Sequence, residues 1–356
     1  MTQAYFLIPG LRLPTHAKDH ISTETLEQLT ELSKGLCSDT IRQELDTGVY
    51  TDSIHYVWAW KVITRRQFAP ALAPFRWLMD HGPELLSEVW QLHLAHREAD
   101  GRLVDVEPLL DEATTEALCL CLTPPLRQEG FVLQRWDTRL YLTRKSDWGV
   151  RVRPWRSVMH SSADACRFED LDGGQSERVV QAREAMQRLE QALSDANIQL
   201  PDGRAIQTLW ISEGGHLQRF YPPTLLRSVL TDDPAILAWA QNAGILDHRT
   251  GRVSGADQWP SDAPNGERLA VIDDLYEPWL TQDWTRWQQK LPEVIATVKR
   301  LSDNARLKGC DGALIVACGS RSTVSLPIKY APRAFSLLAR LTTQKTVPAT
   351  NWLFEE

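Results

Sequence analysis

The N-terminal stretch Tyr5-Phe6-Leu7-Ile8-Pro9-Gly10 is a short apolar run closed by a turn signal. An apolar run without polar alternation predicts a strand covered on both faces, and Pro-Gly predicts the turn that follows it. Three later runs of the same character are separated by helical segments: 206–212, 268–272 and 312–317. Strands that alternate with helices indicate a doubly wound, mostly parallel α/β sheet, which the N-terminal strand would join.

A different pattern interrupts this alternation between residues 89 and 155. Two strand-like runs precede a helical segment, and two alternating runs around Asp137-Thr138 then predict a hairpin. This β-β-α-β-β order predicts a small α+β insertion. The expected division is a first part of the core at 1–88, an inserted unit at 89–155 and a second part of the core at 156–356.

The composition is that of an ordinary globular protein, with 356 residues, 43% hydrophobic and 24% charged. A net charge of -7 argues against a broad nucleic-acid-binding face, although arginines at 151, 153 and 156 leave a local patch open. The N-terminus has no signal-peptide pattern, and no run approaches the roughly 18 apolar residues of a membrane span. With six scattered cysteines, we expect a cytoplasmic protein without a membrane segment.

Functional groups of a doubly wound sheet gather where its strands end. Gly10 ends the first strand in a turn without a reactive side chain. Gly214-Gly215 would let a ligand approach the backbone closely, and His216 could act as a base or a metal ligand. A tight turn with an exposed histidine explains the same residues.

Two further strand ends carry polar side chains. Asp273-Asp274 could hold a hard cation or cap the following loop. Ser320, Arg321 and Ser322 offer hydroxyl and guanidinium groups that could hold an anion. Because no general base is next to them in the sequence, a serine nucleophile is unsupported.

The segment 205–215, Ala-Ile-Gln-Thr-Leu-Trp-Ile-Ser-Glu-Gly-Gly, follows a long predicted helix. It resembles the LWLWGGG segment of the RpfE-type regulatory proteins of proteobacteria. LIPGL at 7–11, WQLHL at 90–94 and IDDL at 272–275 agree with that resemblance, which covers most of the chain. The RpfE-type proteins in turn resemble archaeal-type cofactor-independent phosphoglycerate mutases, members of the alkaline-phosphatase superfamily.

The resemblance implies an alkaline-phosphatase-like core with an inserted domain, and it lets the metal ligands be compared. The enzymes hold two divalent metals around a serine nucleophile. Here Pro9-Gly10 stands where an aspartate is expected, Asp273-Asp274 keeps acid without histidine, and Ser320-Arg321 replaces a ligand pair. An arginine near a two-metal site would repel the metals. The resemblance therefore implies a bacterial pseudoenzyme without a metal cofactor.

Two functions follow from these residues. The first is a non-catalytic, phosphoglycerate-mutase-like protein with a degenerate metal site, which acts in binding or regulation through a protein partner, with a small anion as a second ligand. Its candidate ligand-binding residues are Gly10, Gly214, Gly215, His216, Asp273, Asp274, Ser320, Arg321 and Ser322. The alternative is a metal-dependent phosphomutase or phosphatase that holds Mn or Zn with rearranged ligands, using Asp273, Asp274 and His216.

Overall fold

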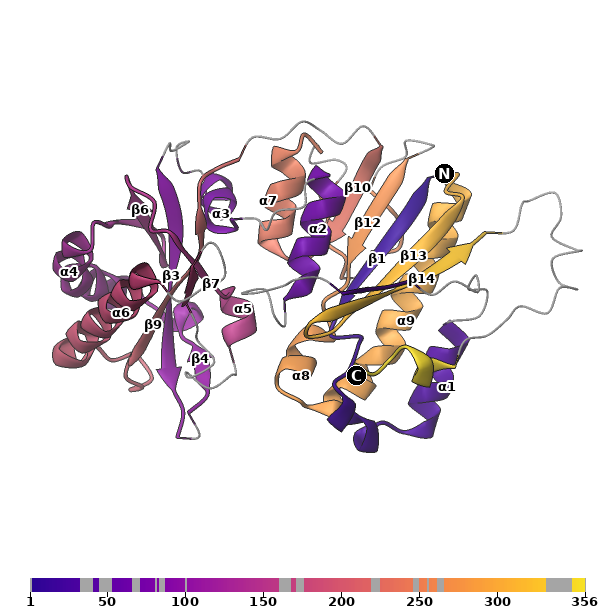
Figure 1. Cartoon of the computed structure of the whole chain (residues 1–356), viewed down its shortest axis with the longest axis horizontal. Helices are drawn as coiled ribbons and strands as arrows, with labels where there is room; N and C mark the ends of the chain where they lie inside the picture. Colours follow the sequence, from indigo (N-terminus) through magenta and orange to yellow (C-terminus); the bar gives the residue numbers. More distant parts are fainter. Residues whose placement is uncertain are drawn as a thin grey trace, which may run out of the picture. The chain divides into compact units, whose positions relative to one another are not determined.

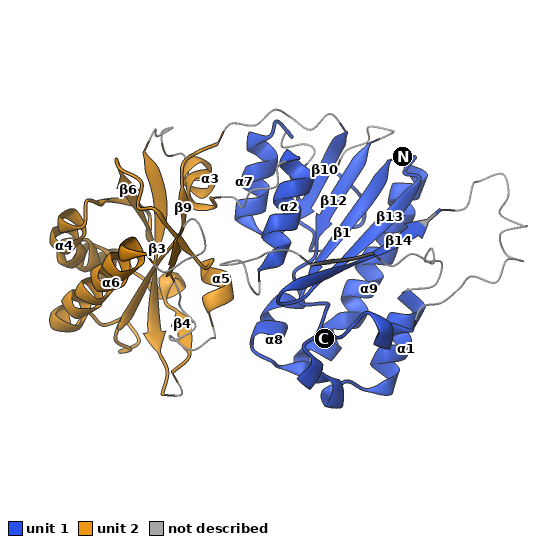
Figure 2. Cartoon of the chain, viewed as in Figure 1, with its two compact units in different colours: residues 1–47, 52–69, 219–356 blue, residues 48–51, 70–218 orange. Residues whose placement is uncertain are grey.

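The chain forms two compact units, coloured separately in Figure 2. The computed structural model describes residues 2–32, 41–44, 53–65, 71–80, 82, 87–99, 101–159, 168–170, 176–218, 225–245, 250–254, 256–260, 266–330 and 348–355. Unit 1 comprises residues 1–47, 52–69 and 219–356, and unit 2 comprises residues 48–51 and 70–218. Unit 2 is thus inserted, in sequence, between parts of unit 1.

Unit 1 is built on a mostly parallel sheet of seven strands in the order β11-β10-β12-β1-β13-β14-β2. The strands from β11 to β13 run parallel, and β14 is antiparallel to both of its neighbours. The strands are β1 (Gln3–Pro9), β2 (Ile41–Glu44), β10 (Leu226–Thr231), β11 (Thr250–Gly251), β12 (Glu267–Val271), β13 (Gly312–Cys318) and β14 (Ser322–Lys329). The protein is therefore a mixed α/β chain.

The central strand β1 is covered on both faces, as its unbroken apolar run predicts. Phe6, Leu7 and Ile8 are at most 1% exposed. Phe6 and Ile8 share a core cluster with Trp287 of α9, whereas α2 contacts β1 without joining that cluster. Figure 1 shows the helices arranged around this sheet. They are η1 (Thr15–His20), α1 (Thr23–Leu32), α2 (Ile54–Thr64), α7 (Pro234–Asn242), α8 (Tyr276–Leu280), α9 (Trp284–Leu307) and η7 (Ala349–Asn351).

Aspartates start two of these helices. The side chain of Asp233 accepts hydrogen bonds from the amides of Ala235 and Ile236 at 2.8 and 3.3 Å. Asp283 accepts one from the Arg286 amide at 3.0 Å. These caps satisfy amides that the first turn leaves without a helical partner, so α7 begins directly after the loop that follows β10, and α9 begins shortly after the end of α8.

Unit 2 contains an antiparallel sheet in the order β4-β3-β6-β5, with β9 paired to β3. Helices α4 and α6 contribute to the core that lies against this sheet. Its strands are β3 (Glu88–Arg97), β4 (Leu103–Asp105), β5 (Val132–Trp136), β6 (Arg139–Arg144) and β9 (Thr208–Gly215), with β7 (Val150–Val152) and β8 (Phe168–Asp170) forming a separate pair. Its helices are α3 (Ala73–Met79), η3 (Glu107–Leu109), α4 (Glu112–Gln128), α5 (Trp155–Val158) and α6 (Glu177–Ala196).

The expected β-β-α-β-β segment is present as β3, β4, α4, β5 and β6. The prediction that residues 206–212 join the parallel sheet is wrong, because β9 pairs antiparallel with β3, with Ile211 opposite Leu92. An apolar run predicts a strand that is buried on both faces, but it does not indicate which strand pairs with it or whether the pairing is parallel. The segment 89–155 lies within the larger unit 2, and its predicted boundaries as a domain stay a prediction.

None of the helices in the described ranges is both long enough and apolar enough to cross a membrane.

Replacing Gly10 with alanine should destabilise unit 1. Gly10 has a φ of 72°, and an added Cβ would lie 2.7 Å from Trp279 Cβ and 2.9 Å from the Leu275 carbonyl oxygen. Backbone strain and overlap together should lower the free energy of unfolding by about 3 kcal/mol. Urea unfolding measures this loss.

Gly251→Ala is the matched control in the same unit. Among the described residues, its Cβ would meet two side-chain atoms, Leu230 Cδ2 at 3.2 Å and Pro260 Cγ at 3.4 Å. A loss below about 1 kcal/mol is expected for this variant. Equal losses in the two variants would contradict the account of Gly10.

Candidate functional site

The carboxyl ends of β12, β1 and β13 lie at one edge of the sheet in unit 1. Leu7 is paired with Val271 and Pro9 with Cys318, so the loops after the three strands begin side by side. Six predicted site residues follow these strand ends: Gly10, Asp273, Asp274, Ser320, Arg321 and Ser322. The other three, Gly214, Gly215 and His216, belong to unit 2. Ligand binding by any of the nine stays a prediction.

At the end of β1, close packing surrounds the backbone of Gly10. The Gly10 carbonyl accepts a hydrogen bond from the Trp287 indole at 2.8 Å. Trp279 packs where a side chain on residue 10 would stand, and its indole donates to the Arg12 carbonyl at 2.9 Å. A ligating side chain therefore cannot be placed at position 10 without displacing Trp279.

Carboxylates gather where β12 ends. Asp274 is exposed, but partial desolvation by its surroundings raises its pKa, repulsion from Asp273 and Glu293 raises it further, and Lys290 acts in the opposite direction. Within the described ranges, the acidic side chains of this loop do not form a group of three with the mutual distances of metal ligands. The structure thus shows acidic groups in proximity, without a preformed three-ligand site.

The loop after β13 holds an anion that belongs to the chain itself. The Glu355 carboxylate accepts hydrogen bonds from the amides of Ser320, Arg321 and Ser322 at 3.0, 3.3 and 3.2 Å. The Ser322 hydroxyl adds a fourth at 2.7 Å. Successive amides that point at one anion form a nest, and we call residues 319–322 the strand-end nest.

Gly319 leaves space for this carboxylate, and Arg12 places a positive charge near it. A side chain on Gly319 would overlap the Glu355 carboxylate, so glycine permits the close approach. Arg12 is 3% exposed, and its Nη1 lies 3.8 Å from Glu355 Oε1. The same guanidinium donates to the carbonyls of Trp352 and Phe354 at 3.3 and 3.2 Å. One buried cation therefore both ties down the C-terminal segment and faces its carboxylate.

Cys318, the last residue of β13, is not an activated nucleophile. Burial raises the pKa of its thiol well above the usual value, and the Glu355 carboxylate raises it further. The thiol thus stays protonated at neutral pH, and the thiolate is the reactive form of cysteine.

Arg12 and Glu355 are functional candidates that the sequence alone does not reveal. Glu355 lies 33 residues after Ser322, and no motif links the two. The indirect signal is the predicted preference of Ser320, Arg321 and Ser322 for an anion. That signal indicates the kind of group to search for, but not its position in the chain.

In unit 2, the Gly214-Gly215 pair serves packing at a β-bulge. The bulge interrupts the pairing of β3 with β9, and Glu213 adopts a φ of 61° there. The Trp90 indole occupies the space where a Gly214 side chain would be. Glu213 is buried, and its carboxylate accepts hydrogen bonds from Arg76 and from the Trp155 amide. A side chain on Gly215 would likewise lie 2.8 Å from Ala71 Cβ, so close packing at the end of β9 accounts for both glycines.

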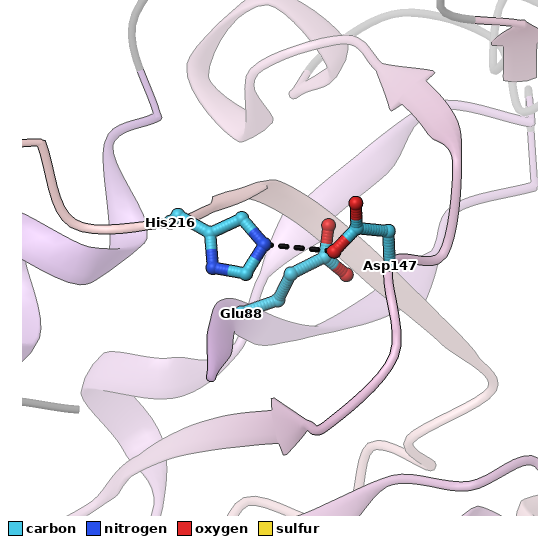
Figure 3. Close-up of side chains that lie close together, drawn as sticks. All are labelled: Glu88, Asp147 and His216. Carbon is cyan, nitrogen blue, oxygen red and sulfur yellow. Dashed lines mark hydrogen bonds and ion pairs between the residues drawn. The ribbon is translucent and has the colours of Figure 1, made fainter. Parts of the chain in front are cut away.

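Three side chains that are distant in the sequence meet beside this bulge. Glu88 begins β3, Asp147 follows β6 and His216 follows β9, and Figure 3 shows them pointing toward one another. The His216 Nε2 lies 2.8 Å from Asp147 Oδ1, and one ligand atom from each residue lies within 4.8 Å of the others. An imidazole and two carboxylates are a donor set suited to Zn²⁺ or Mn²⁺.

The three residues of this triad differ in exposure. Glu88 is 6% exposed, and its Oε2 accepts hydrogen bonds from the Trp148 amide and the Trp90 indole at 2.8 and 3.1 Å. The side chains of His216 and Asp147 are 47% and 69% exposed. The sequence marks His216 as a candidate but not Glu88 or Asp147, because no spacing pattern connects the three residues.

Comparisons with known proteins give structural similarity only. No protein-family model and no curated protein matches the chain. Among solved structures, the cofactor-independent phosphoglycerate mutase from Thermoplasma acidophilum DSM 1728 is 11% identical with a TM-score of 0.40, over 100% of this chain and 93% of that one. The PH0037 protein from Pyrococcus horikoshii is 10% identical with a TM-score of 0.41, over 93% and 88%. At these values the similarity supports no inference about activity.

The raised pKa of Asp274 predicts a pH-dependent cost to stability. Below the usual pKa of aspartate the carboxyl group is protonated in both states, so it costs nothing. Between the usual pKa and the raised pKa of the folded state, the carboxyl group is ionised in the unfolded state but still protonated in the folded state. Stability therefore falls as the pH rises through this range. Asp274→Asn should therefore be more stable than the wild type at pH 7, and the difference should vanish in acid.

Asp202→Asn in unit 2 is a control of opposite sign. Hydrogen bonds from Arg204 lower the pKa of Asp202, so its removal should reduce stability at pH 7. Denaturant unfolding at neutral and acidic pH measures both variants. An Asp274→Asn protein that is less stable than the wild type at pH 7 would overturn the electrostatic account.

Proposed function

We propose that this chain is a non-catalytic, phosphoglycerate-mutase-like protein with a degenerate metal site, which acts in binding or regulation. The observation that carries the proposal is the Glu355 carboxylate in the strand-end nest. This strand end offers hydrogen-bond donors, which are backbone amides and a hydroxyl, together with the cation of Arg12. Such groups bind an anion. A two-metal site needs oxygen or nitrogen acceptors there, and these donors do not serve as metal ligands.

We also propose that unit 1 is a doubly wound, alkaline-phosphatase-like core and that the whole chain is a bacterial, cytoplasmic protein of the RpfE type. Contacts of β1 with both α2 and α9 support the doubly wound arrangement. The short motifs at 7–11, 205–215 and 272–275 support the family resemblance.

A protein partner is the proposed ligand, and the edge of the sheet in unit 2 supports it. Among the described strands, β5 pairs with β6 alone, which leaves the other edge of β5 open to strand addition. Val132 and Trp136 on β5 are 55% and 38% exposed. Tryptophan is enriched among the residues that contribute most to protein interfaces.

Replacing Trp136 with serine should abolish partner binding if β5 is the contact. Affinity purification from native lysate with quantitative mass spectrometry would compare the wild type, Trp136→Ser and Val180→Ser. Val180 is 50% exposed on α6 and is the control. A partner that is retained equally by all three proteins would contradict the role of β5.

A second candidate function is a metal-dependent phosphatase or phosphomutase centred on Glu88, Asp147 and His216. The mutual distances of their ligand atoms favour it. In this proposal His216 and the two carboxylates would hold Mn or Zn, and the metal would supply a Lewis acid and an activated water. The half-exposed His216 side chain would leave room for a substrate.

Metal content and turnover separate the two candidates. If the protein is non-catalytic, elemental analysis after purification without chelator should find no bound Mn or Zn in the wild type that is lost in Asp274→Ala. Phosphomonoesterase and phosphoglycerate mutase assays should show no turnover above a protein-free blank, with Mn or Zn added.

His216→Ala and His20→Ala provide the matched comparison, since His20 is an exposed histidine in unit 1. One bound metal and turnover that disappear only in His216→Ala would establish the second candidate. Two bound metals with turnover abolished by Asp274→Ala would show that the strand-end site is catalytic, and the non-catalytic proposal would fail.

A further inference from the structure

We propose that the strand-end nest is a binding site for phosphate, the free ion or a phosphate monoester, and that the Glu355 side chain closes it as an internal substitute. This inference rests on the proposed function, because it takes the carboxyl edge of the sheet to be an anion site and not a metal site. It adds a ligand class and a means of regulation.

The donors of the nest fill the acceptor positions of one anion. Glu355 accepts three successive amides and one hydroxyl, with the buried Arg12 guanidinium beyond them. Successive amides that converge on one point bind phosphate oxygens as well as carboxylates. Phosphate groups carry about -1.5 to -2 charge near neutral pH, so phosphate gains more than a carboxylate from the same cation.

A second cation stands at the nest. The Arg321 amide is one of the three donors, and its side chain is exposed. In the part of the chain that is described, the Arg321 guanidinium has no hydrogen bond or ion pair. A phosphate in the nest would therefore lie near the buried Arg12 guanidinium, and the exposed Arg321 guanidinium could pair with it from the solvent side. Two cations would then balance the charge of a dianion.

The Glu355 side chain can leave without releasing its backbone. Its side chain is 14% exposed, so the nest reaches solvent. The backbone is held separately, since the Leu13 amide donates to the Leu353 carbonyl and the Glu355 amide donates to the Leu13 carbonyl, both at 2.7 Å. Rotation of one side chain would thus open the site while the C-terminal segment stays in place.

Isothermal titration with inorganic phosphate at constant ionic strength tests this inference in the full chain. Glu355→Ala should bind phosphate at least about tenfold more tightly than the wild type, a difference of about 1.4 kcal/mol. Glu27→Ala, which removes an exposed carboxylate of α1, should leave the affinity unchanged. Adding Ser322→Ala to Glu355→Ala should weaken binding again.

Two results would overturn the inference. One is equal phosphate affinity in the wild type and Glu355→Ala, and the other is a gain for acetate without a gain for phosphate. If Glu355→Ala does not fold, the amide ¹⁵N signals of Ser320, Arg321 and Ser322 in the wild type decide. Phosphate that shifts them beyond a matched chloride control supports the site, and unchanged signals contradict it.

The same samples keep the two proposals distinguishable. Phosphate binding by Glu355→Ala without turnover supports both. Phosphate binding accompanied by metal-dependent phosphatase turnover would keep the anion site and remove the non-catalytic function. If neither phosphate binding nor turnover is observed, the proposed anion site is wrong and the non-catalytic function stands.

Discussion

Three parallel strands that end at one edge of a sheet are the constraint on which the candidate site depends. The pairing of β1 with β12 and β13 fixes where each strand stops, so the loops at Gly10, Asp273 and Ser320 must share that edge. Backbone groups freed at strand ends need partners. In this protein the partners are its own side chains: Trp287 serves the Gly10 carbonyl and Glu355 serves the amides of the strand-end nest.

This arrangement links the far C-terminus to the first strand. Arg12, just after the turn that ends β1, holds the carbonyls of residues 352 and 354 and faces the Glu355 carboxylate. Burying a lone cation or a lone carboxylate is costly, whereas burying both with hydrogen bonds is tolerated. The two groups therefore stabilise each other, and the site is closed by residues that came from opposite ends of the sequence.

Local patterns predicted much of the fold. Apolar runs predict β1, β12 and β13, and the alternating pattern around Asp137 predicts the hairpin of β5 and β6. These predictions succeed because burial and turn formation depend on residues that are close in the sequence. Partners distant in sequence were not predictable. The apolar run of β9 did not reveal its antiparallel pairing with β3, and no spacing joined Glu355 to Ser320 or Glu88 to His216. The hydroxyls and guanidinium of Ser320, Arg321 and Ser322 indicate a preference for an anion, but they do not indicate that the carboxylate of Glu355 lies there.

The occupant of the strand-end nest can be identified in a high-resolution crystal structure of the wild type, grown without phosphate or sulfate and soaked in Mn²⁺. We expect the Glu355 carboxylate on the amides of Ser320, Arg321 and Ser322, with no metal ion at the carboxyl ends of β1, β12 and β13. Two Mn²⁺ ions held by Asp273 and Asp274, with Glu355 displaced from the nest, would contradict this expectation.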